Sequence, residues 1–540
     1  MALLALCGTM TAIFWGPQKS LATVPRAPGD RNILRVAYTQ ILVPDPHQRS
    51  FPFPSANLFI LSLWEPLVEC DPATGQPRPA AAQSWEWSTD RLSLTLKLRP
   101  NARWSNGDQV TAQDFVRGWH RLLRQRIQVA QNLFPLKNAE AYHLGRIKDA
   151  DTVGVRALDD LTLRLELEQV RSTLVSELAD PLLSPLHRTD EKVLKEHLYF
   201  GQPGGLVTNG PFRLIQANYD GYRLATSEFY HGRSEIRLAG VHFIRADSLS
   251  VAPLLLAAGV VDVLTPTPFG VERAKPTTRQ IVRTSELVLA VSALDFNVAR
   301  GPLQDVRVRR ALALALDRVG SIAEFDSAGR MVPAWSWVPS MPGRTGLVLL
   351  KEDANEARQL LASAGFPDGK GFPVLHLALP LWMQGDPYPA AWAERWFREL
   401  GVRTHVVYEP QPLMAKRSAT GDYDVVYGTL IATVPDAGDL LSVFRMPARF
   451  SNTKWNDKDV ICSLAEADTQ TGAERLAILE KAERLAMAQV PSVPMMFERR
   501  QVMLAAEVKG WYPDPLARQS LKRLWLAGES AQDYQPTPRS

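Results

Sequence analysis

The residues that could carry catalysis or hold a metal are dispersed along the chain. The sequence has no G-x-S-x-G, no H-E-x-x-H, no P-loop and no G-x-G-x-x-G between a strand and a helix. Its nine histidines show no paired spacing that would bring two of them onto one metal ion. We therefore expect that the protein is not an enzyme and that it binds no metal and no cofactor. The default interpretation is a binding protein whose ligand lies in a cleft between two lobes.

Composition supports a large protein with more than one compact unit. The chain has 540 residues, of which 46% are hydrophobic, so large cores can form. Basic and acidic residues are balanced, with 61 Lys and Arg against 57 Asp and Glu, and no long basic block is present. Such a block is the usual electrostatic footprint for nucleic acid. We expect no nucleic-acid partner.

The N-terminus resembles an export signal. An apolar run from Ala2 to Trp15 is followed by Ser20-Leu21-Ala22, a small-x-small cleavage pattern. We expect residues 1–22 to be a signal peptide and the mature protein to be periplasmic. No Lys or Arg precedes the apolar run, and Cys7 leaves lipid anchoring open as an alternative. No later segment reaches the roughly 20 uninterrupted apolar residues that span a bilayer.

Two cysteines remain after removal of the signal, Cys70 and Cys462. Two are too few for a disulfide framework or a Cys-rich metal site. We interpret them as separate thiols, with one long-range disulfide as the alternative.

The stretch 79–123 has the best-defined local pattern. Leucines alternate with polar residues from Leu92 to Leu98, as in a half-buried strand, and Asn106-Gly107 predicts a turn. Thr111 and Asp114 have the spacing of a capping box, which predicts a helix start. The apolar face of that helix is formed by Phe115, Val116, Trp119, Leu122 and Leu123.

The same stretch also carries a family pattern. It reads S-W-E-x-S-x-D, an amphipathic strand, L-R-x-N-A-x-W-S-N-G-D and T-A-x-D-F-V-x-x-W. This order resembles the signature region of the bacterial extracellular solute-binding proteins of family 5. Members of that family are oligopeptide-, dipeptide- and nickel-binding receptors of ABC importers.

Further motifs follow in the family's order and cover nearly all of the chain after the export signal. They include VTNGPFRL at 207–214, LVLAVSALDFNV at 287–298, the D-x-R-V-R-R-A-L run from Asp305, and VPSVPMMF at 490–497. The resemblance implies an α/β chain with the two-lobed type II periplasmic-binding-protein fold and an extra inserted subdomain. Strand and helix alternate between residues 373 and 408, which independently predicts a partly parallel sheet.

The resemblance also implies domain boundaries. It predicts lobe I from residues 32–72, 195–285 and 500–528, an inserted subdomain at 73–194, lobe II at 286–499, and a flexible tail at 529–540. The strand at 287–298 is the family's first crossing between lobes, so Asp295, Phe296 and Asn297 are candidate hinge residues. The following Arg307, Arg309 and Arg310 allow an anion site, but we favour a helix start with solvated arginines.

The segment after Tyr427 departs from the family pattern. Oligopeptide-binding members have W-x-A-D-[YF]-x-x-P here, and that Asp pairs with the peptide's α-amino group through a charge-assisted bond. On the simplest alignment Thr433 occupies the Asp position, and a neutral hydroxyl does not replace a carboxylate opposite an ammonium. A shift of three residues would let Asp436 serve, and Asp439 is a weaker candidate.

Other candidate ligand contacts are Phe134, Trp382, Tyr427 and the pair Asn57 and Phe59. Their aromatic side chains would supply the apolar walls that ligand pockets usually have. We expect the protein to capture a peptide or other small molecule between its lobes and to deliver it to ABC permease subunits, as a monomer. A sensor that kept this fold and signals to a partner is the alternative, and a hydrolase is a distant third.

Overall fold

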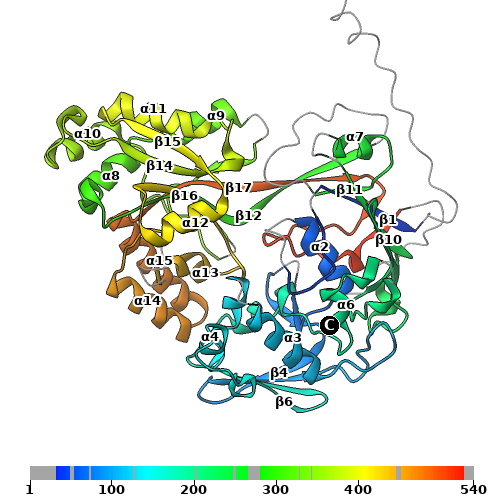
Figure 1. The fold of residues 1–540 in the computed structure, drawn as a ribbon. Helices are drawn as coiled ribbons and strands as arrows, with labels where there is room; N and C mark the ends of the chain where they lie inside the picture. The colour runs from blue at the N-terminus through cyan, green and yellow to red at the C-terminus, as the bar shows by residue number, and fades with distance from the viewer. Residues whose placement is uncertain are drawn as a thin grey trace, which may run out of the picture.

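The computed structural model describes residues 32–527, except 40, 49–53, 72–73, 126–127, 201–202, 247, 249–250, 266–279, 327–328, 342 and 446–451. The predicted signal peptide at 1–22 and the tail at 529–540 lie outside the described residues. Figure 1 shows two lobes joined by two long strands, β12 (Ile281–Phe296) and β17 (Ser492–Ala505). Within the described part of the chain, no helix is long and apolar enough to cross a membrane.

One mixed sheet runs through both lobes. At one end, β14 (Leu375–Pro380) pairs in parallel with β15 (Thr404–Glu409) and β16 (Val425–Ile431), which confirms the predicted parallel pairing. At the other end, β1 (Ile33–Tyr38) pairs in parallel with β10 (Gly240–Arg245) and β11 (Val263–Leu264). The sheet is completed by the antiparallel strands β9 (Gly221–Thr226) and β8 (Phe212–Asn218).

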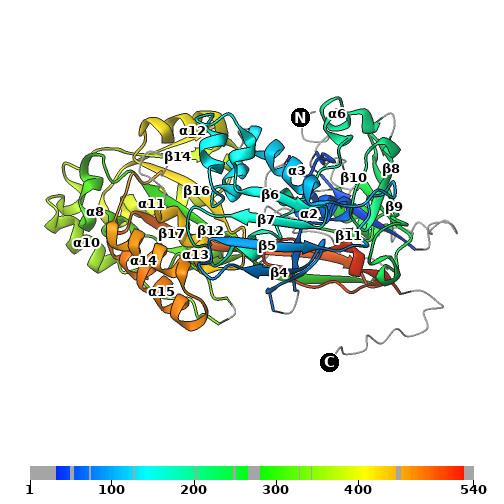
Figure 2. The same cartoon turned by 90° about the horizontal axis from the view of Figure 1, so that it is seen from below.

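A second sheet lies beside lobe I and is formed by β4 (Ala82–Trp87), β5 (Ser93–Leu98), β7 (Thr162–Glu166) and β6 (Val155–Asp159), as Figure 2 shows from below. Helix α3 (Ala112–Arg124) packs beside it, and the predicted capping box between Thr111 and Asp114 is present. The Asp114 carboxylate also accepts a hydrogen bond from Nε1 of the buried Trp104, 3.0 Å away. The strand, the turn at Gly107 and the capped helix are therefore confirmed.

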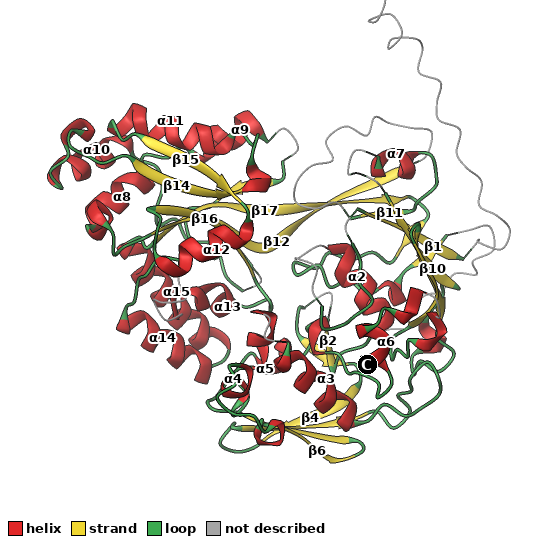
Figure 3. Cartoon of the chain, viewed as in Figure 1, coloured by secondary structure: helices red, strands yellow, loops and turns green. Residues whose placement is uncertain are grey.

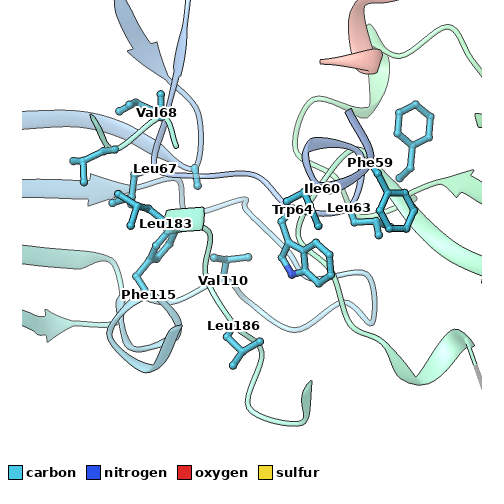
Figure 4. Packing of buried hydrophobic residues seen from close by; sticks show 14 of the residues in the cluster. Phe59, Ile60, Leu63, Trp64, Leu67, Val68, Val110, Phe115, Leu183 and Leu186 are labelled. Atoms are coloured by element: carbon cyan, nitrogen blue, oxygen red, sulfur yellow. The ribbon is translucent and has the colours of Figure 1, made fainter. Parts of the chain in front are cut away.

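The inserted segment and lobe I share one hydrophobic core. Trp64 and Leu67, which follow helix α2 (Pro54–Leu63), belong to the same cluster as Phe115 and Leu183 of the inserted segment, as Figure 4 shows. Helix α2 ends at Leu63, three residues before Pro66. Lobe II has a separate core, so the apolar packing forms two large units.

Lobe II contains several helices, among them α8 (Val306–Leu314), α10 (Ala354–Ser363), α11 (Tyr388–Leu400), α12 (Gln411–Thr420) and α15 (Gly472–Gln489). Of these, α8 confirms the helix start expected after Asp305, and α11 confirms the helix expected between residues 373 and 408. Figure 3 shows α11 and α12 on opposite sides of β14 and β15. Cys70 and Cys462 are separate thiols in the structure, as the favoured interpretation predicts. Cys70 ends β2 (Val68–Cys70), and Cys462 lies in α14 (Lys458–Thr469) of lobe II.

The prediction of solvated arginines at the start of α8 is wrong for one residue. Arg307 is paired with Asp305 at 2.6 Å and Arg310 with Glu356 at 2.9 Å, both near the surface. Arg309 is buried, and its guanidinium donates to the backbone carbonyls of Gln489 and Val490 and to those of the loop before the helix. All three arginines therefore have partners within lobe II, and they do not form an anion site.

Candidate functional site

The two crossing strands connect the lobes through a short, irregular stretch. β12 pairs with β17 on both sides, but the register shifts between Leu287 and Val291. Just before this shift, Glu286 and Arg500 form a buried ion pair across the two strands. Within the shifted stretch, β12 begins to pair with β16 of lobe II at Ala290. The chain therefore passes from one lobe to the other near residues 287–291.

The predicted hinge residues lie farther along, inside lobe II. Asp295 accepts hydrogen bonds from Ser492 Oγ at 2.5 Å and Asn452 Nδ2 at 3.0 Å, and burial raises the pKa of its carboxyl. Phe296 is fully buried, and Asn297 donates to the carbonyls of Gly421 and Tyr423. These three side chains fasten the end of β12 to lobe II, and their role as hinge residues stays a prediction.

Trp382 and Tyr427 lie next to each other in lobe II. Their rings are 6.2 Å apart in an edge-to-face arrangement, and Trp392 of α11 stacks on Tyr427 at 6.1 Å. Trp382 follows the end of β14 and is 52% exposed, whereas Tyr427 is 5% exposed. Trp382 thus offers an accessible aromatic surface, and the buried Tyr427 ring packs against it.

Thr433 and Asp439 contact each other at the start of helix α13 (Ala437–Leu441). The Asp439 carboxylate accepts a hydrogen bond from the Thr433 hydroxyl at 3.1 Å, and the Thr433 and Val434 backbone N–H groups also donate to it. Burial raises the pKa of Asp439, although the backbone donors oppose the shift. Thr433 therefore serves as a partner of Asp439 within lobe II.

Asp436 is the N-cap of α13 and is already ion-paired. It accepts from the Gly438 N–H at 2.7 Å, and its two oxygens receive Nη2 and Nε of Arg475 at 2.7 and 3.1 Å. This bidentate geometry is the strong form of a carboxylate–guanidinium pair. A ligand ammonium at this position would have to compete with Arg475.

The remaining predicted contacts lie in lobe I and the inserted segment. The Asn57 amide of α2 donates to the Leu516 carbonyl at 3.5 Å, and Phe134 is partly buried with its ring 5.2 Å from that of His143. Phe59 is fully buried and packs on Tyr222 and Phe243 at 4.7 and 5.1 Å. Phe59 is therefore a core residue and has no surface to offer a ligand.

A charged contact links the two lobes, and no motif in the sequence predicts it. Arg171 of the inserted segment lies 3.7 Å from the Asp468 carboxylate of α14, and the Ser172 N–H donates to the Asp468 carbonyl at 3.1 Å. On its own side, Arg171 is paired with Glu177 at 2.7 Å. Asp468 is likewise paired with Arg445 of lobe II at 2.6 Å. We call this set of residues the interlobe contact.

Within the part of the chain that the structure describes, no group of three His, Cys, Asp or Glu side chains is placed to hold a metal ion. The arrangement offers instead two lobes, a narrow two-stranded connection, an exposed tryptophan and a charged contact between the lobes. Such a molecule can enclose a ligand when its lobes rotate about the crossing strands.

Comparison with known proteins agrees with this architecture. Residues 76–452 match the family model described as bacterial extracellular solute-binding proteins, family 5. The dipeptide-binding protein DppE of Bacillus subtilis is 24% identical, with 83% of each chain covered. The probable deoxycholate-binding periplasmic protein YgiS of Escherichia coli is 27% identical, covering 85% of this chain and 86% of that one.

A solved structure shows the same fold. The Escherichia coli murein tripeptide binding protein MppA superposes with a TM-score of 0.74 at 22% identity, covering 93% of this chain and 99% of that one. The predicted type II periplasmic-binding-protein fold is therefore confirmed. With the family model matching well over half of its length, the chain belongs to the bacterial extracellular solute-binding proteins of family 5.

Proposed function

We propose that this protein is the extracytoplasmic receptor of an ABC importer, which captures a peptide or peptide-like solute between its lobes and delivers it to the permease subunits. The observation that carries the proposal is the pair of strands β12 and β17 joining two separately cored lobes. Lobes connected in this way can close on a ligand that contacts both of them. We place the receptor in the periplasm and expect it to act as a monomer.

Within this proposal, the bend occurs at residues 287–291, where the strand register shifts. Trp382 offers the ligand a flat apolar wall, supported by Tyr427. Asp436 and Asp439 are the acidic groups nearest to the usual amine site in sequence, but both are saturated by partners of their own lobe. We infer that recognition of a ligand amine is weaker here than in oligopeptide receptors with a free carboxylate at this position.

The test is to identify the molecule that the protein carries. The mature protein is purified from the periplasm of a host grown in rich medium, denatured, and the released small molecules are analysed by mass spectrometry. Peptides among the released molecules support the proposal. A steroid or another non-peptide solute would keep the import role and replace the substrate class. A cleft that is empty and does not respond to added peptides would favour the sensor alternative.

A further inference from the structure

Three polar side chains form a row across lobe II, at the starts of three neighbouring strands. His376 is the second residue of β14, His405 is the second residue of β15, and Asp424 directly precedes β16. Both β15 and β16 run parallel to β14, and His376 and His405 are partners in the register of β14 and β15. Registered partners share one face of a sheet, and neighbouring strands lie about 4.8 Å apart. Linear spacing hides this pair of histidines, because they belong to different strands.

The two histidine rings are separated by a distance that suits one shared metal ion. Their centres lie 5.7 Å apart. A histidine nitrogen binds zinc at about 2.1 Å, so the centres of two imidazoles on one zinc ion are roughly 5–6 Å apart. The His376 side chain is 54% exposed, and His405 is exposed as well. An ion from solution can therefore reach both rings.

Asp424 orients the first of these rings. Its Oδ2 accepts from the backbone N–H of His376 at 2.9 Å and lies 3.1 Å from Nδ1 of the same residue. A carboxylate can only accept, so Nδ1 carries the proton and the lone pair lies on Nε2, as in most metal-binding histidines. His405 makes no hydrogen bond to any other described residue, so its ring can turn a nitrogen toward the same point.

The cation beside this row is already paired. Arg300 Nε lies 3.1 Å from Oδ1 of Asp424, and Nη1 of the same guanidinium lies 3.4 Å from Asp422. The charge of Arg300 is therefore shared between two carboxylates, and Oδ2 of Asp424 remains for His376. A divalent ion at the two rings would meet an imidazole pair that is backed by a carboxylate.

The row lies away from the aromatic wall that Trp382 offers to a ligand. Trp382 follows the C-terminal end of β14 at Pro380, whereas His376 lies at its N-terminal end. The four steps of strand between His376 and Pro380 span roughly 13 Å. Ala378, on the same face as His376, belongs with Met414 of α12 to a small buried cluster. Helix α12 thus covers this face farther along the strand and leaves the two histidines exposed.

We propose that His376 and His405 form a surface site for a divalent transition-metal ion of the zinc and copper class, with Asp424 as a positioning residue. The inference goes beyond the proposed function and does not depend on it. Imidazole nitrogens suit zinc and copper, whereas magnesium and calcium prefer oxygen ligands. The ion takes Nε2 of His376 and one ring nitrogen of His405, and water completes its coordination. It thereby joins β15, the edge strand of the sheet, to β14.

The first experiment is a calorimetric titration of the intact mature protein, purified without a histidine tag. Zinc sulfate, copper sulfate and magnesium chloride are the three probes. We expect one saturable zinc site, tighter binding of copper in the same site, and no binding of magnesium. Absence of zinc binding overturns the proposal, and so does equal binding of zinc and magnesium.

The second experiment compares His376→Asn and His405→Asn with His197→Asn. His197 is an exposed histidine of lobe I whose Nδ1 lies 3.0 Å from the Tyr199 hydroxyl. Its φ of 53° is one that asparagine tolerates. Loss of either proposed ligand should weaken zinc binding by about tenfold or more, and the control should keep the affinity of the unchanged protein. Equal zinc affinities in all three variants would place the ion elsewhere and overturn the proposal.

The third experiment identifies the ligands by a signal that a merely structural role would not change. Electron paramagnetic resonance of bound Cu²⁺ should show two nitrogen donors in the unchanged protein and one in either His376→Asn or His405→Asn. Asp424→Asn should keep both nitrogen donors and weaken zinc binding by about tenfold, the usual effect of losing a partner of a metal-binding histidine. A copper spectrum that is the same in both histidine variants as in the unchanged protein would contradict the assignment. Unchanged zinc affinity in Asp424→Asn would contradict the positioning role of Asp424.

Discussion

Two charged networks of this molecule use the same chemistry in opposite ways. In lobe I, Glu65 lies in a buried network with Tyr230, His231 and Lys522, all from the same lobe. In the interlobe contact, Asp468 is paired with arginines from both sides of the molecule. The first network can break only if the lobe unfolds. The second can break if the lobes separate.

The interlobe contact is arranged so that separating the two lobes costs little free energy. If the lobes part, Arg171 keeps its 2.7 Å pair with Glu177, and Asp468 keeps its 2.6 Å pair with Arg445. Neither half is left as an uncompensated buried charge, which is the situation that makes breaking an ion pair costly. Only the 3.7 Å Arg171–Asp468 approach and the hydrogen bond from Ser172 are lost. A contact of this kind can reverse during each binding cycle.

The largest effect that we predict is on the lobe I network. Glu65→Gln removes one of the two carboxylates that compensate the buried Lys522, the other being Glu69, and it also removes the charge opposite His231. It should lower the free energy of unfolding by about 3 kcal/mol. Chemical denaturation of the variant and of the unchanged protein measures this loss of stability. The matched control is Glu228→Gln, because Glu228 is 75% exposed at its side chain and lies 3.9 Å from Arg213; that change should stay within about 0.5 kcal/mol. Equal losses of stability in the two variants would mean that the burial of Glu65 does not increase its contribution to stability.

Acid should weaken the same network. Burial alone would raise the pKa of Glu65, but Lys522, His231 and Tyr230 outweigh it and lower the pKa to about 2 from 4.5. The stabilisation is therefore fully present above pH 4.5 and is lost as the pH falls toward 2, by about 3 kcal/mol at most. Denaturation curves between pH 6 and 2.5 measure it, and Glu65→Gln should flatten this part of the pH dependence. An unchanged slope in the variant would exclude Glu65 as the source.

A smaller effect is expected at Asp436, which belongs to one lobe but is only partly buried. Asp436→Asn keeps the helix cap and removes the ion pair with Arg475, so stability should fall by about 1–2 kcal/mol. Asp457→Asn is the control, because Asp457 caps α14 through the N–H groups of Asp459 and Val460. Peptide affinity, measured by titration calorimetry, should not change. A tenfold loss in Asp436→Asn alone would make this carboxylate the amine partner.

The smallest effect on stability is predicted for the interlobe contact. Arg171→Lys keeps a cation beside the buried Glu177 but shortens the reach toward Asp468. It should change the free energy of unfolding by less than about 1 kcal/mol, yet it should move the ligand-free ensemble toward separated lobes. Small-angle X-ray scattering measures the radius of gyration, and high salt should have the same effect on the unchanged protein. The control is Arg164→Lys, because the partner of Arg164, Glu166, lies in the same strand. A loss of several kcal/mol without expansion would place Arg171 among the folding contacts.

Local patterns were predictable, because their partners are close in sequence. Thr111 and Asp114 are three residues apart, and the capping box that they imply is present. The alternation around Leu94 and Leu96 likewise fixes a strand face, and both leucines are fully buried. Each of these features depends on backbone geometry that a short segment adopts by itself.

Contacts between distant segments were not predictable from residue types. Arg309 donates to carbonyls 180 and 181 residues away, so nothing near it in sequence indicates that it is buried. Phe59 could have faced a ligand or a core, and the position of β9 and β10 decides for the core. The family motif predicts a crossing strand at 287–298, but the place where β12 leaves one lobe for the other depends on its pairing with β16 and β17.

The core that the inserted segment shares with lobe I limits how the molecule can move. A subdomain with its own core could rotate independently, and ligand closure would then need three bodies to be coordinated. Here Phe115 and Leu183 are packed into the same interior as Trp64 and Leu67. We therefore expect the opening and closing of the receptor to be a single relative rotation of two bodies. One distance between the lobes should suffice to follow it.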